Sequence, residues 1–316
     1  MTQEAAGAGS RLARHPLAAV AAANLVYSGA FPVSGYALRG LSPVTITGLR
    51  FLIASVVMLP AAVPVLRRMP RGDLISIGCM AIVGLWGQMV LIYLGIDASQ
   101  AAIAAVIVGL EPVMIALWAK LLLGETFGAR RSVGLAVGLT GSLLVAGIGS
   151  GGSGNIGGLL LLLGTGLTFS WYTVSSKRFL VRYKVSELLS VVTVIGAAFG
   201  LVPMLVSMAA FNGVHGPTTL TWLCMLYLGI GNSVLGYALW NRGLSGLAAG
   251  AVGASLYAQP VLGALLSWAA LREPLPATFL PGTVVVLLGV WIATSKVGTQ
   301  ITGRVRRSPA GGRRPR

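Results

Sequence analysis

Long runs of apolar residues, separated by short polar stretches, cover almost the whole chain from Leu17 to Lys296. Each run has about the 20 residues that an α-helix needs to cross the hydrocarbon core of a bilayer. The runs are continuously apolar, whereas the strands of a membrane β-barrel alternate over roughly 10 residues. The pattern therefore predicts an all-α polytopic membrane protein. Its ten predicted transmembrane helices lie at residues 17–37, 44–66, 74–96, 100–123, 130–148, 157–179, 186–208, 220–242, 248–271 and 277–296.

Two of these spans carry nearly the same sequence. GLEPVMIALWAKLLLGE (Gly109 to Glu125) and YAQPVLGALLSWAALRE (Tyr257 to Glu273) align without a gap at a constant offset, 257 − 109 = 148. The same offset relates spans three to five to spans eight to ten. In chain order, the sequence therefore predicts a cytoplasmic N-terminal segment (1–16), a five-helix repeat (17–148), a Gly/Ser loop (149–156), a second five-helix repeat (157–296) and a basic disordered cytoplasmic tail (297–316).

The odd number of spans in each repeat has a topological consequence. The second copy must enter the membrane upside down relative to the first, so the two repeats have inverted topology. Repeats of this kind build a pathway for alternating access, because the two halves can exchange roles between the two conformations. The duplication therefore predicts a transporter.

Composition supports a membrane location. Hydrophobic residues make up 55% of the chain, charged residues make up 9%, and the mean hydropathy is +0.85, which is far from the balance of a soluble domain. The net charge of +16 does not indicate nucleic-acid binding, because the charges mark topology. With the N-terminus inside, all of the 23 Lys and Arg residues except Arg39, Arg50 and Arg272 fall on the cytoplasmic side. This bias predicts a multi-pass protein of the bacterial cytoplasmic (inner) membrane with both termini cytoplasmic.

Four stretches carry a resemblance to a known family. They are LSPVTITGLRF, LEPVMIALWAKLLLGE, ALWNRGL and AQPVLGALLSWAALRE. In their order, doubled over ten spans, they resemble the EamA family of the drug/metabolite transporter superfamily. The resemblance implies a central cavity lined chiefly by spans one to four and six to nine, with the fifth and tenth spans peripheral. It also implies export of amino acids or other small metabolites, by proton-coupled antiport or by passive flux.

Glu111 and Arg50 are the candidate proton- or substrate-binding residues. Glu111 lies halfway along span four, where an ionisable group is costly to keep. It either binds a proton or a substrate amine, or it satisfies backbone groups freed by Pro112. Arg50 lies about two turns inside span two. It either binds a substrate carboxylate or phosphate, or pairs with Glu111, or extends its long stem outward to the headgroups.

Polar and aromatic residues at helical spacing predict a neutral, aromatic-lined cavity for amphipathic or aromatic solutes. The alternative for each of them is packing or a place at the membrane interface. The cavity-lining candidates are Asn24, Tyr27, Trp86, Gln88, Tyr93, Phe169, Tyr172, Asn232, Ser233, Tyr237, Trp240, Asn241, Tyr257 and Gln259. Where the first repeat has Glu111, the second has Gln259, so a protonation role in this motif falls on one half only.

Two symmetric pairs complete the set of candidates. Pro112 and Pro260 each remove a backbone donor in mid-helix, which predicts kinks that serve either a gate or static packing. Glu125 and Glu273 lie at helix ends, where we expect them to tie loops to the N-termini of neighbouring helices.

The leading interpretation is a secondary transporter that exports small amphipathic metabolites. No P-loop occurs, so gradients must supply the energy. A passive facilitator and a non-transporting scaffold or sensor are the alternatives. An intramembrane enzyme is disfavoured, because no paired carboxylates and no HExxH motif occur. The expected partners are a small-molecule substrate and the lipid bilayer. The sequence predicts no metal and no cofactor, and it leaves proton coupling and a homodimer open.

Overall fold

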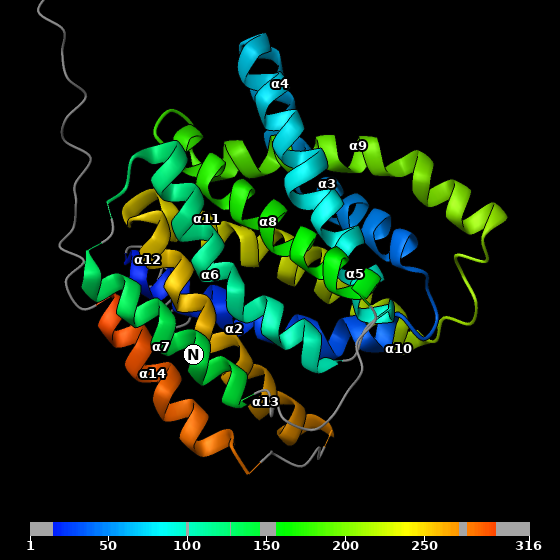
Figure 1. The fold of residues 1–316 in the computed structure, drawn as a ribbon. Helices are drawn as coiled ribbons and strands as arrows, with labels where there is room; N and C mark the ends of the chain where they lie inside the picture. The colour runs from blue at the N-terminus through cyan, green and yellow to red at the C-terminus, as the bar shows by residue number, and fades with distance from the viewer. Residues whose placement is uncertain (1–14, 99–100, 127, 146–155, 272–276, 295–316) are drawn as a thin grey trace, which may run out of the picture.

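The computed structural model describes residues 15–98, 101–126, 128–145, 156–271 and 277–294. Within these ranges the chain is helical apart from turns, loops and one isolated bridge between Leu41 and Val214 (Figure 1). The first repeat comprises α2 (Pro16–Ala37), α3 (Pro43–Arg68), α4 (Arg71–Cys79), the π-helix η1 (Met80–Gly87), α5 (Gln88–Ala98), α6 (Ala101–Leu123) and α7 (Ala129–Val145).

The second repeat follows the same order. It comprises α8 (Ile156–Phe179), α9 (Val185–Ala210), α10 (Thr219–Leu226), the π-helix η2 (Tyr227–Gly236), α11 (Tyr237–Gly246), α12 (Ala249–Ala254), the 3₁₀ turn η3 (Ser255–Tyr257), α13 (Ala258–Leu271) and α14 (Phe279–Thr294).

Joined end to end, these elements make ten helical passes at the predicted places, which confirms the all-helical, ten-span prediction for the described part of the chain. Five passes are individually long and apolar enough to cross a membrane: Pro16–Ala37, Pro43–Arg68, Arg71–Gly95, Val185–Ala210 and Thr219–Gly246. The predicted Gly/Ser loop and basic tail lie outside the described residues, as does Glu273.

Two passes contain a stretch of π-helix that the apolar pattern did not predict. Adding the repeat offset of 148 to the bounds of η1 gives 228 and 235, which fall inside η2. A π-helix bonds i to i+5, and the Ser233 hydroxyl donates to the carbonyl five residues earlier, at Leu228, over 2.9 Å. Such wide turns occur mostly near functional sites. The first stretch, η1, ends next to Gln88. The second, η2, contains Asn232 and Ser233.

The two symmetric prolines lie in different surroundings. Helix α6 continues through Pro112 as a single helix, whereas the ninth span is interrupted by η3 just before Pro260. Proline removes the N–H that would bond to residue i−4. Only the second repeat therefore breaks its helix at this position, although the sequence predicted the two kinks alike.

Helices α7 and α14 lie side by side at one edge of the bundle (Figure 1). Their backbones touch through Gly138 and Gly289. A Cβ added at Gly289 would meet the backbone nitrogen and Cα of Gly138. Small residues allow helix backbones to approach this closely. This contact joins the fifth span of one repeat to the fifth span of the other.

We expect Gly289→Ala to lower the melting temperature of the purified protein in detergent by about 5 °C, because overpacking costs ~1–3 kcal/mol. Gly263→Ala is the matched control, since a Cβ there meets nothing within 4 Å. Its melting temperature should stay level or rise, because Ala favours the helix. Equal melting temperatures for both variants would contradict the backbone contact of α7 with α14.

Candidate functional site

A cavity lies in the middle of the bundle, between elements of both repeats. It has about 640 Å³ of empty space, solvent at its mouth included. The lining residues are Tyr27, Ala30, Ser34, Arg50, Gln88, Met89, Ile92, Tyr93, Glu111, Phe169, Asn232, Tyr237 and Gln259.

Helical spacing explains how neighbouring lining residues reach the same space. Tyr27, Ala30 and Ser34 of α2 follow i, i+3, i+7 and therefore share one face. On α5, Gln88 and Ile92 are four residues apart, and the pass enters this stretch directly from η1. The sequence interpretation omitted Ala30, Ser34, Met89 and Ile92. Helical spacing from Tyr27, Gln88 and Tyr93 was the signal that would have found them.

Arg50 of α3 is buried, with 2% of its surface exposed. Its Nε donates to the Ser233 hydroxyl over 2.8 Å, and its Nη1 donates to the Tyr93 hydroxyl over 3.0 Å and to the Met89 sulfur over 3.1 Å. Its Nη2 donates to the Asn232 side-chain oxygen. All four partners are neutral, so the guanidinium is held in place without a compensating charge.

Two of the alternatives for Arg50 are contradicted by these contacts. The side chain points into the protein instead of extending outward to the headgroups. Among the residues that the structure describes, it forms no ion pair with Glu111. A guanidinium buried in this way lacks an anion.

Glu111 of α6 is also buried, with 7% of its surface exposed. Its backbone carbonyl accepts a 3.4 Å hydrogen bond from the Ser170 hydroxyl, and its Cγ lies beside Gly166, 3.6 Å from where a Cβ would be. The carboxylate itself has no hydrogen bond or ion pair to the described part of the chain. The contacts therefore give no support to a structural role beside Pro112.

Two further polar atoms at the cavity lack partners within the described residues. They are the Tyr27 hydroxyl and the Gln88 side-chain carbonyl. Buried polar groups in proteins are normally hydrogen-bonded, so unpaired ones around a cavity indicate where a ligand would bond. With Arg50 and Glu111, they give the cavity one guanidinium and one carboxyl group on different helices. Such an arrangement can neutralise a solute that carries both charges.

Aromatic rings pack against one another beside the cavity. Tyr27 contacts Tyr237 and Trp240 at centroid distances of 5.7 and 5.9 Å, and Phe169 contacts Trp240 and Tyr172 at 5.8 and 6.5 Å. We call these five rings the aromatic layer. Tyr172 and Trp240 do not line the cavity. They support the three rings that do.

Hydrogen bonds hold the inner rings of the aromatic layer. The Trp240 indole donates to the Thr173 hydroxyl over 3.3 Å. Asn241 donates to the Tyr172 hydroxyl over 3.1 Å. Asn241 therefore fixes the layer from behind instead of lining the cavity.

The other cavity-lining candidates also lie away from the cavity wall. Asn24 donates to the Ser255 hydroxyl over 2.8 Å and accepts from Gln259 over 3.1 Å, which joins α2 to η3 and α13. Ser233 holds Arg50. Trp86 packs against Phe199 of α9, with a centroid distance of 5.2 Å. Tyr257 donates to the carbonyl of Leu135 in α7 over 2.8 Å.

Comparison with known proteins gives a consistent picture. A family model described as the EamA-like transporter family matches residues 16–147 and 156–295. An uncharacterized transporter of Archaeoglobus fulgidus is 28% identical over 84% of this chain and 94% of its own length. A protein of Streptantibioticus cattleyicolor named "Probable terminal-alkyne amino-acid exporter" is 27% identical over 92% of this chain and 95% of its own. A crystal structure that is 25% identical covers 88% of this chain and 95% of its own with a TM-score of 0.73.

The unpartnered carboxylate leads to a prediction about stability. Glu111→Gln should leave the melting temperature in detergent unchanged or raise it by a few degrees, because the amide keeps the shape and removes an unpaired buried charge. The control is the same substitution at a glutamate whose carboxylate is hydrogen-bonded, Glu125→Gln. It should lower the melting temperature, because the Glu125 carboxylate accepts several hydrogen bonds. A clear loss of stability in Glu111→Gln would reveal a structural role.

Proposed function

Because the chain belongs to the EamA-like transporter family, we propose that it is a secondary transporter that exports amino acids or related amphipathic metabolites by alternating access. The observation that carries this proposal is the shared cavity of Arg50 and Glu111. Both are buried there and neither has a charged partner. Keeping two unpaired charges within a membrane is costly, and a zwitterionic solute offsets both costs at once.

Different lining residues of the cavity suit the carboxylate, the ammonium group and the side chain of an amino acid. The planar donor fork of Arg50 matches a carboxylate. Glu111 accepts an ammonium group, and Gln88 and the Tyr27 hydroxyl add neutral hydrogen-bonding groups. Phe169, Tyr237, Met89 and Ile92 provide an apolar and aromatic wall for the side chain. Apolar and aromatic amino acids are therefore the solutes that fit best.

One of the relatives supports this substrate class. The Streptantibioticus protein is named as a probable exporter of a terminal-alkyne amino acid, a zwitterion with an apolar side chain. The other relative is a transporter without an assigned substrate. Both align over most of the chain.

Direction and coupling are further parts of the proposal. The bias of Lys and Arg places both termini in the cytoplasm of a bacterial cell. Glu111 then exchanges a proton from outside for the ammonium group of a solute from inside. The second repeat cannot do this, because its equivalent residue, Gln259, is an amide without an ionisable proton, and it donates to Asn24 over 3.1 Å.

Transport into inside-out membrane vesicles tests the function. Vesicles containing the protein, its Glu111→Gln variant or neither are given labelled leucine and phenylalanine, with and without an acid-inside pH gradient. We expect the wild type to concentrate both amino acids only when the gradient is imposed. The Glu111→Gln variant should lose concentrative uptake, because it lacks the exchanging carboxyl.

The other outcomes are equally informative. Gradient-independent equilibration by both proteins would show a passive facilitator. Uptake no greater than in empty vesicles, for amino acids and for other metabolites, would overturn the transporter proposal and leave a scaffold or sensor.

Arg50→Lys tests the recognition of the carboxylate. It keeps the positive charge but loses the planar fork, so uptake of phenylalanine below saturation should fall about tenfold. Phenethylamine, which lacks the carboxylate, should compete poorly with phenylalanine in the wild type. The control is Arg39→Lys, an arginine outside the cavity lining, which should leave uptake unchanged. Equal competition by phenylalanine and phenethylamine would contradict the role of Arg50.

A further inference from the structure

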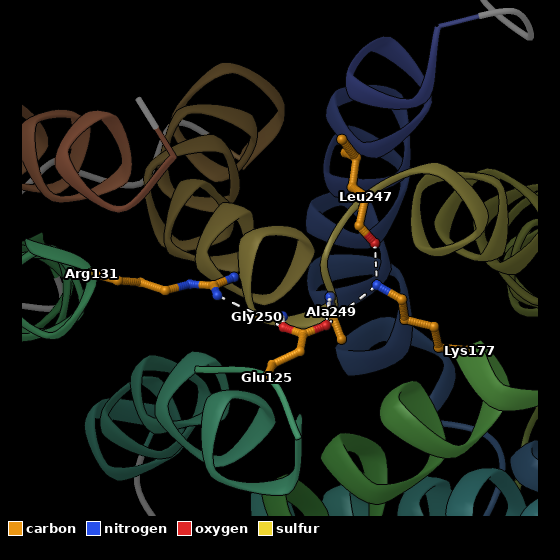
Figure 2. A network of polar contacts seen from close by, with 6 residues as sticks. All are labelled: Glu125, Arg131, Lys177, Leu247, Ala249 and Gly250. Atoms are coloured by element: carbon orange, nitrogen blue, oxygen red, sulfur yellow. Dashed lines mark hydrogen bonds and ion pairs between the residues drawn. The ribbon is translucent and has the colours of Figure 1, made fainter. Parts of the chain in front are cut away.

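A second polar cluster lies at the far end of α6. The Glu125 carboxylate accepts hydrogen bonds from the backbone nitrogens of Ala249 over 2.8 Å and Gly250 over 3.3 Å, and from Lys177 over 3.3 Å (Figure 2). Arg131 approaches it to 3.7 Å. The expectation that Glu125 ties to a neighbouring helix N-terminus is thereby confirmed, since Ala249 and Gly250 begin α12.

Lys177 extends the same cluster. Besides Glu125, it donates to the carbonyl of Leu247 over 2.6 Å, in the loop just before α12 (Figure 2). Lys177 of α8 therefore binds the loop before α12, and Glu125, just after α6, binds the first residues of α12. We call Glu125, Lys177 and Arg131, with the start of α12, the Glu125 cluster.

The Glu125 cluster joins the two repeats. Glu125 and Arg131 belong to the first repeat, whereas Lys177, Leu247, Ala249 and Gly250 belong to the second. Two other ion pairs also cross between the repeats, Arg68 with Glu187 and Arg182 with Asp73, but each has an arginine that is mostly exposed. The charged side chains of the Glu125 cluster are only 14–22% exposed. Ion pairs that are shielded from water are worth more than exposed ones.

The Glu125 cluster lies at one end of the pathway that contains the cavity. Helix α6 continues 12 residues beyond Glu111, about 18 Å, before it ends at Leu123, and Glu125 follows that end. Lys177 is likewise 8 residues beyond Phe169, and Ala249 is 10 residues before Gln259. All three connections lead from the cavity to the same end. Between them lies the aromatic layer, with Trp240 and Tyr172 fully buried.

We propose that Glu125 is a latch that closes the cytoplasmic end of the pathway in this conformation. The Glu125 cluster must open before a solute can pass between the cavity and the cytoplasm. This inference rests on the proposed function, because it assigns one of the two closures that alternating access requires. On this proposal, the cavity is reached from the opposite end, toward which the lining residues Ser34, Arg50 and Tyr93 lie.

The contacts fit a closure that can be released. The carboxylate bonds to backbone N–H groups of another repeat through its side chain alone, so a small separation of α12 from α6 breaks both of these bonds together. The groups left behind are near the aqueous interface, where water can replace the lost hydrogen bonds at modest cost. A covering of apolar side chains would offer no such exchange.

Labelling of a cavity cysteine measures the latch without any substrate. In a background with Cys79→Ser and Cys224→Ala, an Ala30→Cys reporter in the cavity wall is treated with a membrane-impermeant maleimide in right-side-out and inside-out vesicles. We expect the reporter in the wild-type cluster to react mainly from the outside. Glu125→Gln should raise the rate of labelling from the cytoplasmic side about tenfold and lower the outside rate.

Two further variants make this test discriminating. Lys177→Gln removes the opposite charge of the same cluster, so it should shift labelling in the same direction even where Glu125→Gln folds poorly. Glu187→Gln is the matched control. It removes an exposed ion pair between the repeats and should change the rates less than about twofold.

Unchanged labelling in both Glu125→Gln and Lys177→Gln, with wild-type levels of folded protein, would overturn the latch. A rise from both sides would also overturn it, because that result indicates general loosening.

The latch and the proposed function fail in different ways. Normal amino-acid uptake with unchanged labelling rejects only the latch, whereas absent uptake with the expected labelling shift rejects only the proposed cargo.

Discussion

The cost of keeping charge away from water governs this structure. A chain surrounded by lipid can hide most of its ionisable side chains at helix ends, and this one does so with Asp73, Glu125, Lys177 and Glu187. Arg50 and Glu111 are different, because they stay deep in the bundle without a charged partner. Their positions decide which helices must surround the cavity. Tyr93 of α5, with Asn232 and Ser233 of η2, holds one guanidinium.

The two repeats share a framework but divide the chemistry. The π-helical stretches η1 and η2 occupy equivalent positions, so this irregular backbone was present in both copies. The motif around residues 111 and 259 has diverged instead. The first copy presents a carboxylate to the cavity, and the second presents an amide that links α13 to α2 through Asn24. The first repeat therefore has a carboxyl group at this position, whereas the second has an amide that joins two helices.

The sequence predicted what depends on apolar pattern and repetition. The ten passes and the tie made by Glu125 follow from local rules of helix length and helix ends. The direction in which a side chain points from its helix was harder to predict. A π-turn rotates everything after it, so Trp86 packs against Phe199 instead of lining the cavity. The break before Pro260 likewise turns Tyr257 toward α7, and a period of 3.6 residues cannot anticipate either change.

The backbone contact of α7 with α14 also limits how the halves can move. At Gly138 and Gly289, no side chain separates the two backbones, and side chains of both helices pack on either side of this contact. A displacement along this seam would soon bring a larger side chain against a backbone. Rotation about the seam avoids this clash. The peripheral pair thus acts as a pivot, and the largest displacements fall on the helix ends that lie farthest from it.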